Sequence, residues 1–466
     1  MYDLVIYLAY FFEAQRTQSD NMTTMTSLPV EERLWQLLQH LGIAKAHFAG
    51  WMSADWTGLV TTYPGAVVSL TLAGPSLIDP LTAEHLASKL LMFSEERGPR
   101  AELAQRAAAG VPDARLVVLR DYSILPWADV AADRTDEMEA SMMPFLAQTG
   151  SRAEIKSLSS GEGAGEVAGI FYRVRGAGPP LVLMPLFLAP SQWEPLIPRL
   201  SEQYCTITLS GPELGIAPFL ESRGSALGYV QMVRTLLDEI QLQPGETVLE
   251  IGCGTGVITR WLAQRLGQEH RVVGMDINPY LLREASMYAR RDGLEGAIEF
   301  REGNAEALPF PNNSVDVTLS VTVIEEVDAT QMLAEMFRVT KPGGRVAVIS
   351  RATDMPLLMH LPLSEELKAK VQRPGVIMAS VGERGCADAS LYQRLYQAGL
   401  TKVKMFPQLA SFTDADTHVL PFLQTALLST LSQEEAHEWR RGCVQAKAEG
   451  TFFMACPHHC AVGTKS

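Results

Sequence analysis

The sequence predicts an α/β protein whose second half forms a doubly wound, mainly parallel sheet. From Thr247 to the end of the chain, short apolar strand patterns alternate with helical patterns. The glycine-rich turn 252–256 follows the first of these strands, and Asp276 ends the next one. Sheets of this kind bind ligands at the carboxyl ends of their strands, so these residues define the expected site.

The expected strands of the second half occur in regular order. The first helix after the glycine turn has an apolar face of Ile258, Trp261, Leu262 and Leu266. Short runs rich in apolar and β-branched residues predict the strands. They are 247–251, 271–275, 298–301, 315–320, 345–350, 402–406 and 451–456.

Length and composition predict a globular protein of two or three domains. The chain has 466 residues, 47% of them hydrophobic and 20% charged. The expected domains are 1–150 and 225–466, with a Gly- and Ser-rich linker at 151–168 and a short strand-rich segment at 169–224. The apolar run 4–12 is too short to span a bilayer, so it predicts a buried strand, and no membrane span is expected.

Charge and cysteine content limit the partners and the compartment. A formal net charge of −14 argues against nucleic acid, because binding to a phosphate backbone needs clustered Lys and Arg. Six cysteines in a chain of this length do not form a disulfide framework, and a reducing cytoplasmic location is expected. The expected partner is therefore a small molecule.

The residues around the glycine turn favour one class of ligand. Glycines let the backbone approach a ligand closely, and Asp276 follows at the spacing at which a carboxylate binds ribose hydroxyls. Val257 stands where a dinucleotide site has its third glycine, and the charge of Glu250 would repel a pyrophosphate. The same charge suits the ammonium and sulfonium groups of S-adenosylmethionine.

Five ordered motifs resemble those of the class I methyltransferases, most closely the ubiquinone/menaquinone-type, small-molecule branch. They are Glu250-Ile-Gly-Cys-Gly-Thr-Gly256, Asp276, Gly303-Asn-Ala-Glu-Ala-Leu-Pro-Phe310, Asp316 and Lys341-Pro-Gly-Gly344. The resemblance implies that the glycine loop contacts the methionine part of the donor, that Asp276 binds the ribose, and that Asn304, where relatives often have Asp, meets the adenine. The implied cofactor-binding residues are Glu250, Gly252, Cys253, Gly254, Gly256, Asp276, Ile277, Asn304 and Ala305.

Candidates for a catalytic base are few. Members of the family commonly have a histidine after the fourth strand, where this chain has Glu325 and Glu326. These two residues and His360 are the candidates, although an in-line methyl transfer can proceed by positioning alone. The motif Cys456-Pro-His-His-Cys460 is expected to hold no metal, because alternation along a strand sends its side chains to opposite faces.

The first half resembles an α/β-hydrolase over residues 30–75. Its turn Gly50-Trp-Met-Ser-Ala54 has Met52 at the nucleophile position and Ser53 one place later. No histidine occurs between His85 and the linker, so the usual triad is absent. Residues 169–215 resemble the opening of a second hydrolase-like unit, with Pro185-Leu186 at the oxyanion position. One composite lobe and two incomplete lobes both fit, and either is expected to be inert.

The leading interpretation is a methyltransferase that uses S-adenosylmethionine and a small organic acceptor, with oxygen favoured slightly as the acceptor atom by base rates. Two alternatives come from other classes, namely a non-catalytic ligand-binding or scaffold protein and a hydrolase with an atypical site. Intact cofactor motifs favour the first interpretation, whereas Met52 and the missing histidine count against the hydrolase. The sequence specifies neither the acceptor nor the oligomeric state.

Overall fold

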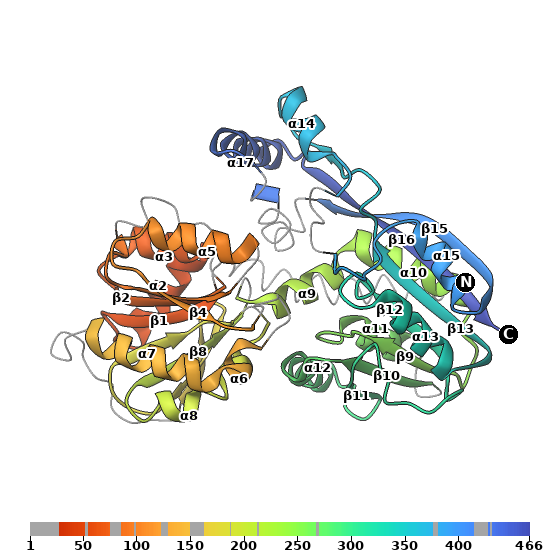
Figure 1. Ribbon diagram of the computed structural model, residues 1–466, viewed down its shortest axis with the longest axis horizontal. Helices are drawn as coiled ribbons and strands as arrows, with labels where there is room; N and C mark the ends of the chain where they lie inside the picture. Colours follow the sequence, from red (N-terminus) through yellow and green to blue (C-terminus); the bar gives the residue numbers. More distant parts are fainter. Residues whose placement is uncertain are drawn as a thin grey trace. The chain divides into compact units, whose positions relative to one another are not determined.

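The chain divides into two compact units, each built on its own eight-stranded sheet (Figure 1). Unit 1 spans Met1–Pro218 and unit 2 spans Phe219–Ser466. The strand expected at 4–12 and residues 151–162 of the expected linker lie outside the described residues. The computed structural model describes residues 28–51, 55–74, 85–96, 99–122, 129–149, 163–186, 188–211, 214–266, 270–375, 381–413, 427–428 and 431–466.

Unit 1 is a mixed sheet in which parallel strands predominate. Its strand order is β4-β3-β2-β1-β7-β8-β6-β5, and only β6 runs antiparallel to its neighbours, β5 and β8. The strands are β1 (Ala46–Trp51), β2 (Val67–Ala73), β3 (Leu90–Glu95), β4 (Arg115–Leu119), β5 (Gly163–Val167), β6 (Ile170–Arg175), β7 (Pro180–Leu183) and β8 (Cys205–Ser210). The helices are α2 (Val30–His40), α3 (Asp55–Thr62), α5 (Pro99–Ala109), α6 (Val130–Asp133), α7 (Thr135–Thr149), α8 (Ile197–Leu200) and the 3-10 helix η1 (Pro190–Trp193).

Helices cover both faces of the unit 1 sheet (Figure 1). Helices α2, α3 and α5 pack on one face around Phe48 and Leu70. Helices α6, α7 and α8 pack on the other face around Ala49 and Phe93. Because both faces are buried, the central strands are apolar at almost every position, as parallel sheets require.

The segments 30–75 and 169–215 form one sheet, because β1 pairs in parallel with β7 through His47↔Leu181, Phe48↔Val182 and Ala49↔Leu183. Of the two arrangements left open by the sequence, the structure has the composite one. Strand β5 lies inside the region expected to be linker, where Gly165 lets the Tyr172 ring cover the backbone of the β5-β6 hairpin.

Unit 2 is a doubly wound sheet of order β11-β10-β9-β12-β13-β16-β14, with β15 paired to β16. The strands are β9 (Thr247–Ile251), β10 (Arg271–Asp276), β11 (Ile298–Glu302), β12 (Val315–Val321), β13 (Thr340–Arg351), β14 (Leu358–His360), β15 (Leu400–Thr413) and β16 (Phe453–Lys465). Helix α9 (Ile216–Ser225) spans the boundary between the units. The other helices are α10 (Leu227–Ile240), α11 (Val257–Leu266), α12 (Pro279–Arg291), α13 (Ala329–Val339), α14 (Glu365–Val371), α15 (Ser390–Gln397) and α17 (Gln433–Ala448).

All seven strands expected in the second half are present, and the sheet places the expected site at its switch point. The chain runs from β9 outward to β10 and β11, and from β12 in the opposite direction to β13. The loops after β9 and β12 therefore leave adjacent strands at the same edge, where ligands bind in open α/β sheets. Helices α13 and α15 pack on one face around Val346 and Val348.

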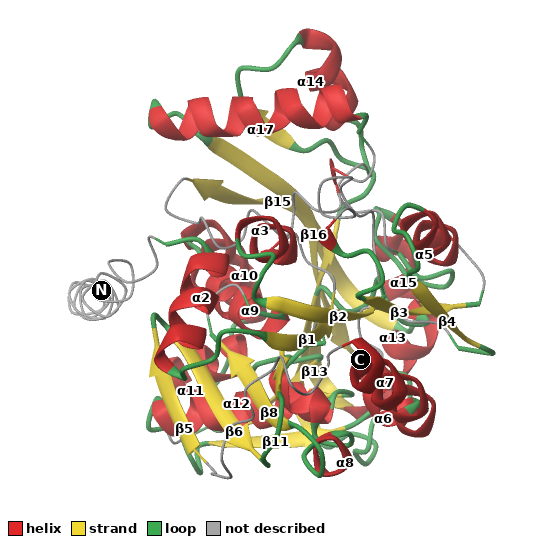
Figure 2. Cartoon of the chain, turned by 90° about the vertical axis from the view of Figure 1, so that its left-hand side faces the viewer, coloured by secondary structure: helices red, strands yellow, loops and turns green. Residues whose placement is uncertain are grey.

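Strands β15 and β16 continue beyond β13, and β14 pairs with the far end of β16. Strands β15 and β16 pair with each other from Leu400↔Lys465 to Thr413↔Phe453. Beyond this long ribbon, α14 and α17 lie side by side, joined by an ion pair between Lys370 and Glu435 (Figures 1 and 2). Within the described residues, no helix combines the length and the apolarity that crossing a bilayer requires.

We expect the early strands of unit 1 to depend on the later ones for solubility. A fragment of residues 1–150 would leave the β1 edge, which normally pairs with β7, open to other chains. This fragment should be insoluble, whereas the matched fragment 1–218, which contains every strand of the sheet, should be soluble. Expression of both, followed by sedimentation and urea unfolding, checks this expectation. A soluble 1–150 fragment with cooperative unfolding would show that the sheet needs no completion.

Candidate functional site

The glycines of the loop after β9 let its backbone lie close to the neighbouring chain at the edge of the sheet. Gly252 has a φ of +73°, and a Cβ atom there would lie 2.2 Å from the Val323 side chain. The peptide N–H groups of Gly252 and Cys253 both donate to the carbonyl of Met275, at 2.7 and 2.9 Å. A larger residue at 252 would therefore displace either the loop or the neighbouring chain, which explains the need for glycine.

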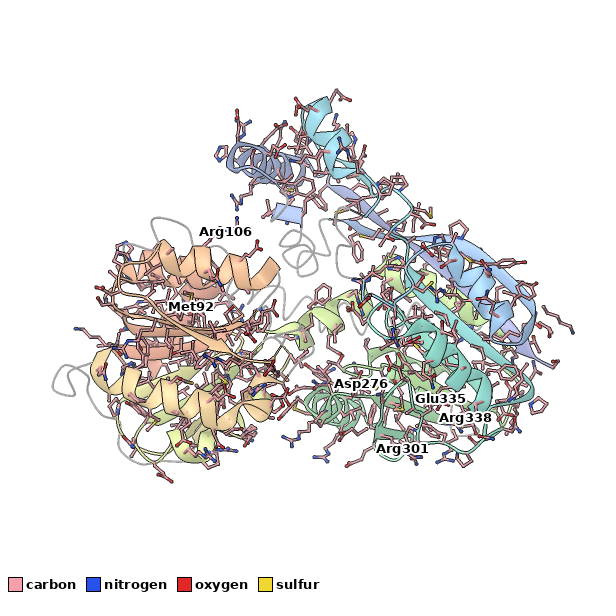
Figure 3. All side chains as sticks on the ribbon, in the orientation of Figure 1. Met92, Arg106, Asp276, Arg301, Glu335 and Arg338 are labelled. Atoms are coloured by element: carbon pink, nitrogen blue, oxygen red, sulfur yellow. The ribbon has the colours of Figure 1, made fainter. Side chains whose placement is uncertain are left out.

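Asp276, at the end of β10, fixes the middle of this loop (Figure 3). Its Oδ2 atom accepts the N–H of Gly254 at 2.7 Å, and its Oδ1 atom accepts the N–H of Asn278 at 2.9 Å. The side chain is buried, and burial raises the pKa of its carboxyl group. Each oxygen retains a second lone pair, so the carboxylate can still accept a bond from a ligand.

Glu250 is buried at the carboxyl end of β9, beneath the loop. It accepts a hydrogen bond from the Thr259 hydroxyl on α11. Burial raises the pKa of Glu250 to about 8, an effect that the nearby charge of Asp276 strengthens. Two carboxyl groups thus lie beside the glycine loop, an arrangement that suits a cationic ligand and opposes a pyrophosphate.

The loop after β11 meets the end of β10, because Gly303 donates its N–H to the carbonyl of Asp276 at 3.0 Å. Ala305 is buried, whereas Ile277 and Asn304 are exposed. The Asn304 Oδ1 atom accepts the N–H of Glu306 at 2.8 Å, which closes a tight turn. The structure therefore brings the expected donor-binding residues to one edge of the sheet.

Arg338 and Glu335, one turn apart on α13, hold the far end of this loop (Figure 3). The guanidinium of Arg338 donates to the carbonyls of Leu308 and Phe310, at 2.9 and 2.8 Å. Glu335 pairs with Arg338 and accepts the N–H of Leu308 at 2.7 Å. These contacts give the loop a fixed conformation before any ligand binds.

Helix α9 packs on the glycine loop through a buried charge cluster. Glu221 accepts a hydrogen bond from the Thr255 hydroxyl at 2.6 Å and pairs with Arg260 of α11. Arg260 also pairs with Asp292 at 2.9 Å and donates to the Thr255 carbonyl at 2.8 Å. Unit 2 comprises Phe219–Ser466 and therefore includes these residues of α9.

The three base candidates lie in different surroundings. Glu325 is fully buried, one of its oxygens accepts the N–H of Arg351, and burial raises its pKa. Glu326 forms an ion pair with the Arg351 guanidinium. His360 is exposed on β14, four strand positions from β9 and hence about 19 Å from it. The structure therefore brings Glu325 and Glu326, but not His360, to the switch point.

The motif Cys456-Pro-His-His-Cys460 lies on β16, and its side chains alternate between the two faces of the sheet. His459 bonds through Nε2 to Asp354 at 2.7 Å, and His458 bonds through Nδ1 to the Cys456 carbonyl at 3.0 Å. Burial raises the pKa of both thiols to about 12. Within the described part of the chain, no cluster of three or more potential ligands could hold a metal ion.

Two polar residues that the sequence did not single out also face this region. Arg223 on α9 has a buried Nε atom without a hydrogen-bond partner, and Tyr229 on α10 has a buried hydroxyl beside Thr322. Tyr229 occupies the apolar face of α10, and Arg223 sits in a charged helical stretch. The sequence does not distinguish these two residues from their neighbours, because the burial of their polar atoms arises only when the chain folds.

The fold and the site together define a Rossmann-like protein of the class I methyltransferase type. A family model described as "Methyltransferase domain" matches residues 249–348. The ubiquinone/menaquinone biosynthesis C-methyltransferase UbiE of Cronobacter sakazakii is 34% identical over 176 residues, covering 37% of this chain and 65% of that protein. UbiE of Klebsiella pneumoniae is 32% identical over 197 residues, covering 40% of this chain and 74% of that protein.

The chain belongs to the family of class I methyltransferases that includes these proteins, whose methyl donor is S-adenosylmethionine. Among solved structures, geranyl diphosphate C-methyltransferase from Streptomyces coelicolor A3(2) is 15% identical, with a TM-score of 0.33. The match covers 51% of this chain and 79% of that one. The chain spans 65% of the length of the Cronobacter sakazakii relative. Because the relatives are named C-methyltransferases, the comparisons give no support to the expected preference for oxygen.

We expect Glu250 to make stability depend on pH. Its folded pKa of about 8 lies above its ordinary value of 4.5, so the folded state retains a proton that the unfolded chain has lost. This contribution is complete below pH 4.5 and is lost as the pH rises to about 8. Glu250→Gln cannot ionise, and it should therefore unfold with a free energy about 2–4 kcal/mol above wild type at pH 8, with little difference near pH 4.5.

Urea unfolding without added nucleoside, repeated across this pH range, measures the difference. Glu295→Gln, at an exposed surface ion pair with Arg290, is the matched control and should show no such trend. A difference between Glu250→Gln and wild type that stayed constant with pH would contradict the raised pKa.

Proposed function

We propose that this protein transfers a methyl group from S-adenosylmethionine to carbon in a small organic acceptor. The observation that supports the donor assignment is the bond from Gly254 to buried Asp276, which holds the glycine loop beside the carboxylate that would bind the ribose. Family membership supports the reaction, and the names of the relatives support carbon as the acceptor atom. The expected partner of the protein is this small-molecule acceptor.

The residues present fit this donor. Asp276 would accept the ribose hydroxyls through its remaining lone pairs, and Asn304 with Ala305 would border the adenine. Glu250 lies under the loop, where a ligand that carries ammonium and sulfonium charges would stabilise the ionised form of its carboxyl group. The exposed side chain of Ile277, directly after Asp276, offers an apolar surface for the adenine ring.

Positioning accounts for the methyl-transfer step without a dedicated general base, and the proton that the acceptor carbon loses passes to water. When bound, S-adenosylmethionine supplies a methyl group on a positively charged sulfur, which leaves as a neutral thioether. The loop after β12 would border the acceptor, because β12 adjoins β9 at the switch point. Glu325 and Glu326 are both tied to Arg351, so their first role is to fix this loop. Alignment of acceptor and methyl group can supply most of the acceleration.

We infer that unit 1 is an α/β-hydrolase-like lobe without hydrolytic activity. Its central strand β1 is followed by the hydrolase-like turn and then by α3, and β7 lies beside β1. At the oxyanion position, Pro185 has no N–H group, and the N–H groups of Leu188 and Ala189 both donate to Gln192. Residues 52–54 of the turn lie outside the described residues.

Donor binding tests the main proposal. Isothermal titration of wild type with S-adenosylmethionine and S-adenosylhomocysteine should give micromolar affinity, while a nicotinamide dinucleotide should bind more weakly. Asp276→Ala should lose about 1.5–3 kcal/mol of donor binding, because it removes charge-assisted bonds and releases the Gly254 N–H. Asp238→Ala, at an exposed ion pair on α10, is the control. Tighter binding of the dinucleotide would overturn the cofactor assignment.

Incubation of the full chain with ¹³C-methyl-labelled donor and metabolite extracts, read by mass spectrometry and NMR, tests the transfer and the acceptor atom. A labelled product bearing a carbon-bound methyl group is the expected result. A methyl group bound to oxygen or nitrogen would refute carbon as the acceptor atom but leave the methyltransferase assignment intact.

Unit 1 should not hydrolyse esters. Wild type and Ser53→Ala should show the same background with p-nitrophenyl acetate and butyrate, since Met52 replaces the nucleophile and no free N–H pair is available from Leu188 and Ala189. Mass spectrometry after treatment with a fluorophosphonate probe checks the same point. Covalent labelling of Ser53 would show that the lobe is active.

A further inference from the structure

Arg223 on α9 is an arginine whose hydrogen bonds are incomplete. Its Nε atom is buried and has no hydrogen-bond partner. Among the described residues, no carboxylate forms an ion pair with it, in contrast to Arg260, which pairs with Glu221 and Asp292. A guanidinium is always charged in proteins, and a buried charged donor left without an acceptor is costly.

Aromatic rings hold this guanidinium in place. Its central carbon lies 4.9 Å from the centroid of the Tyr229 ring and 5.6 Å from that of the Phe219 ring. The Tyr229 hydroxyl is itself buried, without a well-aligned hydrogen bond, and the Thr322 side chain lies beside it. Stacking orients the planar group but supplies no acceptor for its N–H groups, and the Nε donor has none among the described residues.

The pair lies at the edge of the sheet where the donor and the acceptor would meet. Helix α9 is tied to the glycine loop by Glu221 and Thr255, and Gly224 packs directly against Val257 at the start of α11. Burial raises the pKa of Tyr229, and charges on Glu250 and Glu325 also act on it. The hydroxyl lies beside Thr322, which directly follows β12.

Arg223 also acts on the opposite side of this region. Burial lowers the pKa of His458 to about 3, and the charge of Arg223 contributes to the decrease. His458 is on β16, beyond β13 in the sheet. Carboxyl groups of Glu250, Asp276 and Glu325 occupy the rest of the edge, so Arg223 supplies positive charge among acidic neighbours.

We propose that Arg223 and Tyr229 form a carboxylate-binding subsite. The planar guanidinium matches the geometry of a carboxylate, and the tyrosine hydroxyl would add a third hydrogen bond. The proposal rests on the proposed function, which leaves two sources of the carboxylate. One is the methionine end of the donor, and the other is an acid group on the acceptor.

Calorimetry separates these sources with two nucleosides that differ by one group. S-adenosylhomocysteine carries the carboxylate, whereas S-adenosyl-3-thiopropylamine keeps the amine and lacks the carboxylate. With the donor as the source, Arg223→Gln weakens binding of S-adenosylhomocysteine roughly 10- to 100-fold and leaves the decarboxylated compound within about twofold. Arg223→Lys keeps the charge without the planar fork and gives a smaller loss, and Tyr229→Phe weakens only the carboxylate-bearing nucleoside.

Arg265→Gln, at an exposed ion pair with Asp238, is the matched control and changes neither affinity. If Arg223→Gln leaves S-adenosylhomocysteine binding intact, benzoate is titrated into the full chain saturated with this nucleoside. If benzoate binds to wild type but not to Arg223→Gln, the subsite belongs to the acceptor. Unchanged binding of both ligands in Arg223→Gln overturns the subsite. Failure of wild type to bind either nucleoside refutes the proposed function instead, and thermal unfolding of each variant identifies any loss of fold.

Discussion

The hydrogen bond from the Gly254 N–H to the buried carboxylate of Asp276 joins the two strands on which the site of unit 2 depends. It closes the loop after β9 onto the end of β10, and the bonds from Gly252 and Cys253 to Met275 reinforce this closure. Helix α11 starts directly from the fixed loop, and α9 packs on top of it. A single carboxylate thus sets both the backbone path and the polarity of the edge.

Several carboxyl groups lie at this edge of the sheet, and their burial makes them harder to ionise. Glu250, Asp276 and Glu325 all have pKa values raised by desolvation, so their charges are costly unless a cation approaches. A ligand carrying positive charge offsets that cost, whereas a dinucleotide would add to it. The buried Arg260 acts differently, because Glu221 and Asp292 neutralise it and make it part of the scaffold.

The sequence predicted the centre of unit 2 well and its periphery less well. Strand β9 has the predicted bounds, because its apolar run is short and ends at glycine. Strand β16 runs to Lys465, beyond the run expected at 451–456, since its later residues owe their strand conformation to pairing with β13 and β15. Propensity does not report such long-range pairing.

Features that arise only from packing could not be predicted from the sequence either. The pairing of β1 with β7 joins segments far apart in the chain, and no local pattern encodes it. Arg223 resembles any solvated helical arginine until α9 and α10 enclose its Nε atom. Asp276, in contrast, was predictable as a site residue because strand end and spacing are local properties.

The strand order of unit 1 also has a consequence during synthesis. Strands β1 to β4 leave the ribosome first, but the inner edge of β1 is covered only by β7, which begins at Pro180. At about 5–20 residues per second, the nascent chain carries an open apolar edge for several seconds. A ribosome-associated chaperone would therefore bind the early strands during this interval. Slower translation of residues 120–180 would lengthen the interval.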